Sequence, residues 1–282
     1  MTDLLFPFQF PFMQNAFFIC AIVSVPSALL SCFLVLRGWA LMGDAISHAI
    51  LPGVVLAYII GLPVIVGAFV AGMICAVTTG YLSENSRVKP DTVMGVVFSG
   101  MFGLGIVLYV AVPTNMHLDH ILFGNMLGVG PQDLWTAGGI AILVCLGLVL
   151  KWRDILLHSF DPAQASAAGL PTQWLYYGLL IALSLTIVAT LSAVGLILTI
   201  GLLIAPGAIA FLLVRRFQAM MFVSVVVCFS AMMVGTYASF YLDSAPGPTI
   251  ILVLTAVFLV AFIRRQIQIT RAARRSEQVD LG

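Results

Sequence analysis

Charged residues are scarce in this sequence, and lysine is nearly absent. Of the 282 residues, 8% are charged and 62% are hydrophobic, whereas a soluble domain carries about 25% charged residues. Apolar runs of roughly 20 residues, each long enough to cross a hydrocarbon core of about 30 Å, recur along the whole chain. This composition excludes a soluble domain on a single anchor and predicts an all-α, polytopic transmembrane bundle.

The two lysines, Lys89 and Lys151, do not follow a GxxxxG run. A P-loop needs such a lysine to bind nucleotide phosphates, so the chain is not expected to hydrolyse ATP itself. The five cysteines stand singly without a CxxC pair, which excludes a disulfide framework and a zinc knuckle. No basic residue precedes Arg37, so we expect the N-terminus to lead into the first span rather than to form a cleaved signal peptide.

The sequence predicts one transmembrane domain covering residues 1–282. Three glycines and a proline between residues 195 and 207 leave open an eight-span alternative, in which part of 174–214 is a broken or re-entrant helix buried in protein. The expected spans cover about 13–36, 40–60, 62–82, 92–112, 132–150, 174–191, 194–214, 220–241 and 248–264.

Basic residues follow every odd-numbered span. Because lysine and arginine near span ends mark the cytoplasmic side, we expect the N-terminus outside and the tail 265–282 in the cytoplasm. These residues are Arg37, Arg87, Lys89, Lys151, Arg153, Arg215, Arg216 and the arginines between 264 and 275.

The fourth expected span carries small residues at four-residue spacing, namely Gly95, Ser99 and Gly103. Small residues let two helices approach closely. This face is therefore predicted to pack against another helix.

An aspartate and a histidine lie within the second expected span. Asp44 stands well inside an apolar run, where a carboxylate costs about +2.5 to +3.5 kcal/mol on insertion scales. His48 follows four residues later and so projects from the same helix face. Measured from Arg37, the two residues lie roughly 10 and 16 Å into the membrane, close to its middle.

Two interpretations of this pair are open. In the first, Asp44 and His48 bond to each other, or to Ser47, simply to satisfy buried polarity. In the second, they form half of a site for a divalent transition metal, since carboxylate suits Mn²⁺ and imidazole suits Fe²⁺ and Zn²⁺. Two copies of the chain around a central pore would then place two aspartates and two histidines around one ion. Such a transient site suits conduction, where an ion must leave as well as enter.

The outer loop 113–131 contains His117, Asp119 and His120. We name these three residues as candidates for metal entry, although exposed loop histidines more often bind nothing. Together with His158 they are expected in loops rather than in spans. No HExxH motif occurs, so an intramembrane metalloenzyme with three protein ligands and an activated water is not favoured.

The longest polar interruption, 158–173, is expected in the cytoplasm. Asp161 or Ser159 is predicted to cap a short helix. Pro162 suits its first position, and Gly169 suits its end.

A short motif in the second expected span carries a family resemblance. The chain resembles the permease subunits of ATP-binding-cassette importers for manganese, zinc and iron (ABC-3 type), and is most similar to those of periplasmic manganese/iron systems of Gram-negative bacteria. The similarity continues in order through 91–108, 120–129, 160–171 and 195–213. The residues of the Gly-Asp-x-x-Ser-His-x-x-x-Pro-Gly core are Gly43, Asp44, Ser47, His48, Pro52 and Gly53.

The resemblance implies a type II importer-like permease of the bacterial inner membrane that moves Mn²⁺ or Fe²⁺, with Zn²⁺ also allowed. It implies that Asp44 and His48 line the path and contact the metal, and that no cofactor is held beyond the transported ion. Residues implied to couple the chain to a separate ATPase subunit are Asp161, Pro162, Ala165 and Gly169.

The expected partners are that ATPase, a periplasmic metal-binding protein, membrane lipid, and a second permease chain in a homodimer or heterodimer; no nucleic acid is expected. The alternative is a metal channel or secondary carrier without an ATPase. Carriers often contain several intramembrane carboxylates, whereas this chain has one. Oxygen and nitrogen ligands admit all three metals, so the sequence does not rank them.

Overall fold

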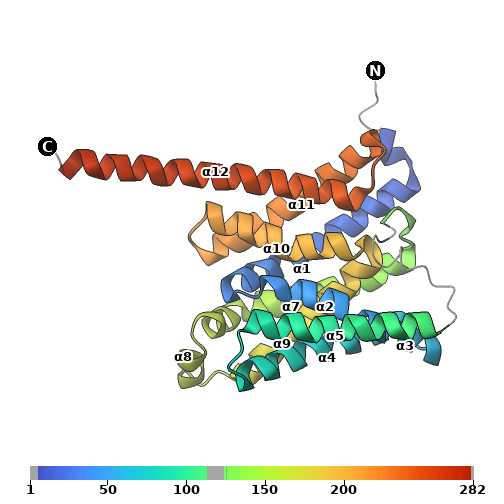
Figure 1. The fold of residues 1–282 in the computed structure, drawn as a ribbon. Helices are drawn as coiled ribbons and strands as arrows, with labels where there is room; N and C mark the ends of the chain where they lie inside the picture. The colour runs from blue at the N-terminus through green and yellow to red at the C-terminus, as the bar shows by residue number, and fades with distance from the viewer. Residues whose placement is uncertain (1–5, 113–123, 125, 281–282) are drawn as a thin grey trace.

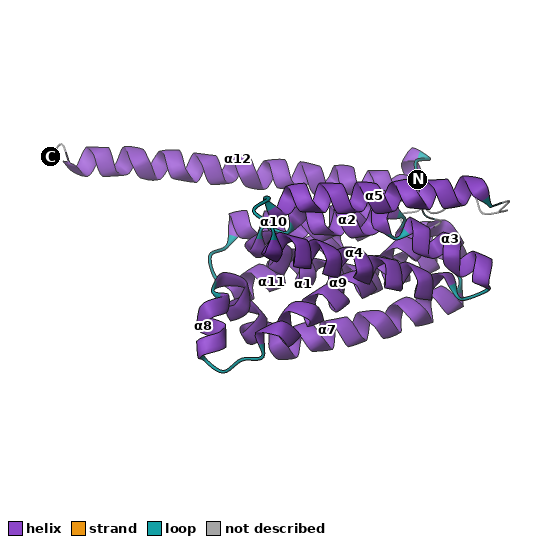
Figure 2. Cartoon of the chain, turned by 60° about the horizontal axis from the view of Figure 1, so that its bottom comes forward, coloured by secondary structure: helices purple, strands orange, loops and turns teal. Residues whose placement is uncertain are grey.

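The computed structural model describes residues 6–112, 124 and 126–280, and within these ranges every regular element is a helix (Figure 2). Nine segments of the described chain are long and apolar enough to cross a membrane. The elements are η1 (Phe6–Gln9), α1 (Pro11–Arg37), α2 (Ala40–Ala49), α3 (Leu51–Ile60), α4 (Val64–Asn85), α5 (Pro90–Ala111), η2 (Met126–Gly128), α7 (Pro131–Phe160), α8 (Pro162–Ala167), α9 (Thr172–Val194), α10 (Leu196–Leu213), α11 (Phe217–Leu242) and α12 (Pro246–Asp280).

The nine predicted spans are confirmed, and the eight-span alternative is not. Gly195, whose φ of 83° is a left-handed value that favours glycine, ends α9 and starts α10. The helix α10 then continues past Pro206 to Leu213. Each of the two helices is long enough to be a span of its own.

The spans lie roughly parallel or antiparallel to one another, with α1 at the centre of the bundle (Figure 1). The helix α1 packs against α7, α10 and α11, and its side chains Leu30, Phe33 and Leu34 are fully buried. The N-terminus lies at one end of the bundle, while α8 and the C-terminus lie at the other (Figure 1). In the view of Figure 2, α5 runs along one side of the bundle and α7 along the opposite side.

The second span consists of α2 and α3 with a break at Ile50. Pro52 has no N–H to donate to the carbonyl four residues earlier, which interrupts the helical hydrogen bonding. Ile50 nevertheless keeps right-handed helical angles, and its carbonyl accepts a hydrogen bond of 3.1 Å from the N–H of Val54. The span therefore continues across the membrane as one element with a local irregularity.

Backbone contact fixes α3 against α4. A Cβ atom on Gly53 would overlap the carbonyl oxygen of Gly67, and a Cβ atom on Gly67 would overlap that of Gly53. Only glycine fits either position, because any side chain would push the two helices apart.

One sequence-based expectation is wrong. The helix α7 runs to Phe160, ten residues beyond the predicted end of the fifth span, and His158 lies in its last turn with 5% of its surface exposed. A helix does not have to end where the membrane ends, so the polar residues after 150 did not mark its terminus. The small-residue face of α5 has no neighbour among the described residues, since nothing lies within 4 Å of a Cβ atom built on Gly95 or Gly103, and its packing against another helix stays a prediction.

Candidate functional site

The helix α2 carries the only predicted metal-binding pair that lies inside the described bundle, and it packs against α4, α5, α9 and α10. It begins where Gly38, in the left-handed region at φ 71°, turns the chain out of α1. Gly43 admits the neighbouring α10, since a Cβ atom there would lie 2.9 Å from Cδ1 of Leu203. The start of α2 therefore packs closely against α10 beside Asp44.

The structure brings Asp44 and His48 together. Oδ1 of Asp44 lies 3.4 Å from Nε2 of His48, and the side chains are 32% and 26% exposed, respectively. Ser47 takes no part in this pair, because its hydroxyl donates a 2.7 Å hydrogen bond to the carbonyl of Gly43 in its own helix. The sequence allowed Asp44 and His48 to bond either to each other or to Ser47. The described structure contains the first of these contacts and not the second.

The accessible side chains of α2 share one face. Leu41 is 51% exposed, and Asp44 and His48 follow it at spacings of three and four residues, the helical repeat. The remaining side chains of α2 that the structure describes are buried. The polar pair is therefore partly accessible from the outside of this single chain, in a segment long and apolar enough to span a membrane, where an uncovered ionisable group is costly.

Aromatic rings of α5 hold the imidazole of His48. The ring centroid of Phe102 lies 5.2 Å away in an edge-to-face arrangement, and that of Phe98 lies 5.9 Å away. Nδ1 of His48 is buried and has no hydrogen-bond partner among the described residues. The packing leaves Nε2 directed toward Asp44, so one nitrogen and one carboxylate are presented together.

The two phenylalanines were not singled out from the sequence. Their four-residue spacing is the signal that could have identified them. It equals the spacing of Asp44 and His48, so each pair occupies a single helix face. The packing of α5 beside α2 could not be predicted from the sequence.

The described part of the chain brings two candidate metal ligands together. Among the described residues no group of three or more His, Cys, Asp and Glu side chains converges on a point. His117, Asp119 and His120, the candidates for metal entry, lie outside the described residues. The described residues therefore place no third such side chain beside the pair on α2.

The segment between α7 and α9 folds as its capping residues predict. Asp161 caps α8, because its Oδ1 accepts a 2.9 Å hydrogen bond from the N–H of Gln164, and Pro162 occupies the first helical position. Ala165 is fully buried against the bundle. Gly169 ends the turn at φ 76°, as a left-handed C-terminal cap requires.

The other side chains named for this segment behave differently. Ser159, the alternative cap, instead donates to the carbonyl of Ile155 at 2.6 Å. The rest of α8 is exposed. A short, capped, solvent-facing helix at one end of the bundle is a suitable docking element for another protein.

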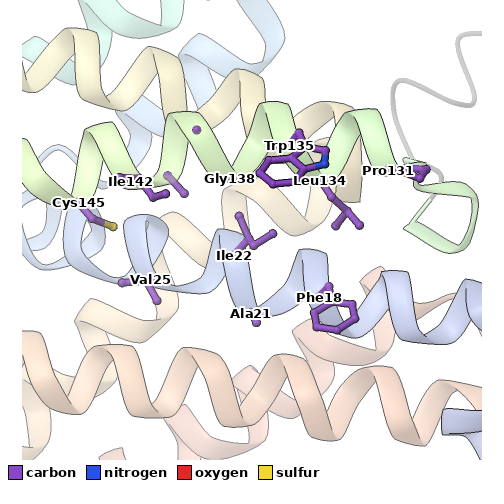
Figure 3. A pocket seen from close by; sticks show the side chains of 12 residues that line it. Phe18, Ala21, Ile22, Val25, Pro131, Leu134, Trp135, Gly138, Ile142 and Cys145 are labelled. Carbon is purple, nitrogen blue, oxygen red and sulfur yellow. The ribbon is translucent and has the colours of Figure 1, made fainter.

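A wide apolar groove of about 890 Å³ lies between α1 and α7 (Figure 3), and neither Asp44 nor His48 lines it. Phe18 and Ile22 line it from α1, and Trp135 and Ile142 line it from α7. Cys145 is its one potential metal ligand, without a carboxylate or imidazole beside it. This groove suits hydrocarbon rather than an ion.

Comparisons with known proteins agree along nearly the whole chain. The model of the ABC 3 transport family matches residues 9–265. The chain is 53% identical to the chelated iron transport system membrane protein YfeD of Yersinia pestis over 93% of this chain and 88% of that one. It is 46% identical to the manganese transport system membrane protein MntB of a Synechocystis strain, over 91% of this chain and 84% of that one.

A solved structure has the same fold. PsaBC from Streptococcus pneumoniae in complex with Fab matches at a TM-score of 0.83 and 36% identity, over 92% of this chain and 94% of that chain. A metal-chelate type ABC transporter in an inward-facing conformation matches at a TM-score of 0.69 and 17% identity, over 89% and 86% of the chains. The second likeness concerns the fold alone.

Proposed function

Because the chain belongs to the ABC 3 transport family, we propose that it is the membrane-spanning permease subunit of an ATP-binding-cassette importer for a divalent transition metal. It is a multi-pass protein of the bacterial inner membrane. Relatives named for iron and manganese transport support Mn²⁺ and Fe²⁺ as the favoured cargo, and Zn²⁺ fits the same ligands. Import, rather than export, is part of the proposal.

The observation that carries this proposal is the outward-facing pair of Asp44 and His48 at membrane depth. Their 3.4 Å contact presents an oxygen and a nitrogen ligand on one helix face. An ionisable pair on that face has to be covered by protein or water. A second permease chain, identical or a sister, would cover it and add two more ligands, giving one ion a four-ligand ring.

A ring of this kind binds an ion without trapping it. Each chain contributes two ligands, and Nδ1 of His48 has no hydrogen-bond partner among the described residues. Hydrogen bonds from the second nitrogen normally strengthen a histidine ligand. The resulting weak site suits transport, in which the ion must also leave.

Energy and cargo come from other subunits in this proposal. Neither lysine of the chain belongs to a P-loop, so a separate ATPase hydrolyses ATP and docks on α8 from the cytoplasm. The N-terminal end of the bundle then faces the periplasm, where a metal-binding protein delivers the ion.

The test is uptake of radioactive Mn²⁺ into metal-starved cells that lack other importers. Asp44→Ala and His48→Ala should each reduce uptake at least tenfold, because each removes half of the ligands contributed by the chain. Pull-down of the ATPase should stay at the wild-type level. Asp154→Ala, which removes a carboxylate paired with Lys151 at the end of the bundle, is the matched control and should transport normally.

Normal uptake by both variants would remove this site from the path. Competition by Fe²⁺ and Zn²⁺ in the same assay ranks the cargo. Full uptake in cells without the ATPase would instead support the alternative of a channel or secondary carrier.

A further inference from the structure

Arg37 stands at a junction of three spans, at the end of the bundle that holds α8. Its Nη2 atom lies 3.1 Å from Nε2 of His158 in α7. Its guanidinium carbon lies 4.0 Å from the ring centroid of Trp39 and 5.3 Å from that of Tyr176 in α9. The two rings also meet edge to face at 5.6 Å. One cation thus connects α1, α7 and α9.

Two members of this cluster flank α8. His158 lies three residues before the cap Asp161, and Tyr176 lies in the second turn of α9, directly after the connection from α8. The helix α8 itself packs against α7 and α9. His158 is buried, so its ring has little freedom to move apart from the helix. A displacement of α8 therefore reaches the surroundings of Arg37 through both flanking helices.

The other members lead to the metal-binding pair. Arg37 is the last residue of α1 and Trp39 caps α2, with only Gly38 between them. Asp44 follows Trp39 by five residues of continuous helix, about 7.5 Å at a rise of 1.5 Å per residue. The cluster therefore holds the end of the helix that carries Asp44 and His48.

Space beside the cluster allows it to rearrange. A cavity of about 220 Å³ is bounded by Arg37, Trp39 and Tyr176, together with Met42, Thr79 and Met94. Protein interiors are otherwise packed to the density of organic crystals. The guanidinium stays charged and binds through both stacking and hydrogen bonding, so it can hold its partners while the rings shift.

From this juxtaposition we propose that Arg37 is a positioning residue that transmits movement of α8 to the Asp44–His48 pair. The proposal rests on the proposed function, because it assumes that the ATPase acts on α8. Loss of the cluster then uncouples the transporter: ATP is still hydrolysed, but the metal-binding helix no longer follows.

The experiment uses the full complex of permease, ATPase and metal-binding protein in lipid vesicles, with Mn²⁺ uptake and ATP hydrolysis measured together. Arg37→Gln should lower uptake at least tenfold while hydrolysis stays within twofold of wild type. Arg153→Gln is the matched control, because this exposed arginine of α7 also stacks on an aromatic ring, Trp152, at 5.3 Å. It should keep the wild-type ratio of metal imported to ATP hydrolysed.

A second variant tests the same contact if Arg37→Gln fails to fold. His158→Gln leaves Arg37 in place and should also lower the ratio of metal to ATP. The double variant should be no worse than Arg37→Gln alone, because both changes break one connection.

Wild-type ratios in both single variants would overturn the proposal, as would a parallel fall of uptake and hydrolysis, or independent effects that multiply in the double variant. Absence of uptake by the wild-type complex would count against the proposed function instead.

Discussion

The imidazole of His48 is oriented by aromatic packing. A metal-binding histidine usually donates its second N–H to a carboxylate, carbonyl or water, which fixes the ring and strengthens the ligand. Here Phe98 and Phe102 fix the ring, and no acceptor for Nδ1 exists among the described residues. In the proposed metal site, the ring is therefore positioned without being made a stronger ligand.

Phe102→Ala tests this role of aromatic packing. An aromatic pair contributes about 0.5–1.5 kcal/mol beyond its buried area. Its loss should therefore raise the Mn²⁺ concentration that gives half-maximal uptake roughly 2- to 10-fold, while ATP hydrolysis continues. Phe222→Ala, which removes a ring that is 71% exposed on α11, is the control. If both variants reach half-maximal uptake at the same Mn²⁺ concentration, Phe102 does not position the ligand.

Residues that act locally were predicted from the sequence, and those that act across the fold were not. Asp44 and His48 share a helix face by their spacing alone, and Asp161 caps the helix that directly follows it. The contact between Arg37 and His158 joins residues 121 positions apart, so no local pattern encodes it. Its two members looked like a membrane-boundary arginine and a loop histidine.

Among the elements, α8 combines a stable local fold with an exposed surface. Its cap at Asp161 and its left-handed end at Gly169 fix a helix of six residues that is too short to be stable in isolation. The capping hydrogen bond and the buried Ala165 compensate for that shortness. The helix is thus preorganised for the docking role proposed for it.

Asp161→Ala should therefore release the ATPase. Loss of a capping side chain costs about 1 kcal/mol, enough to fray so short a helix. We expect reduced pull-down of the ATPase with unchanged membrane insertion. Ser166→Ala, on the exposed surface of α8 with its hydroxyl outside the cap, is the control for a general surface effect. Unchanged pull-down in Asp161→Ala would separate α8 from ATPase docking.

The spans themselves were predictable because 20 consecutive apolar residues are a strong signal. The end of α7 was not, because KWRD at 151–154 resembles a membrane boundary although the helix continues through it. The sequence also did not reveal that the small-residue face of α5 lacks a neighbour in the part of its own chain that the structure describes. A close-packing pattern shows that a helix can be approached, but not by which helix.

For the whole molecule, the exposed sides of α2 and α5 point to a second chain. Only 17% of the most apolar window of α5 is buried, the smallest share among the nine candidate spans of the described chain. The same side of the bundle carries Asp44 and His48 beside α5. Covering this side with a second permease would bury the small-residue face and complete the metal site together.

Cysteine cross-linking in membranes tests this arrangement. In a Cys145→Ser background, which removes the one thiol that is not buried among the cysteines, Ser99→Cys on α5 should form a covalent dimer with a short bifunctional thiol reagent. Gly139→Cys, on the exposed face of α7, should stay monomeric. A dimer formed through α7 but not through α5 would place the partner on the wrong side for a shared site.

The backbone contact between Gly53 and Gly67 is a fixed point, or fulcrum, of the second span. The segment from Gly53 back to Trp39 is then the arm of a lever that pivots at this contact. The arm ends at Trp39, where the Arg37 cluster holds it. Asp44 lies nine residues from the fulcrum and His48 five, or about 13.5 and 7.5 Å along the helix. A swing of this arm moves the carboxylate almost twice as far as the imidazole. Under the proposed mechanism, an ion would therefore lose its oxygen ligands first, and the site would open on the side nearer Arg37, toward the cytoplasm.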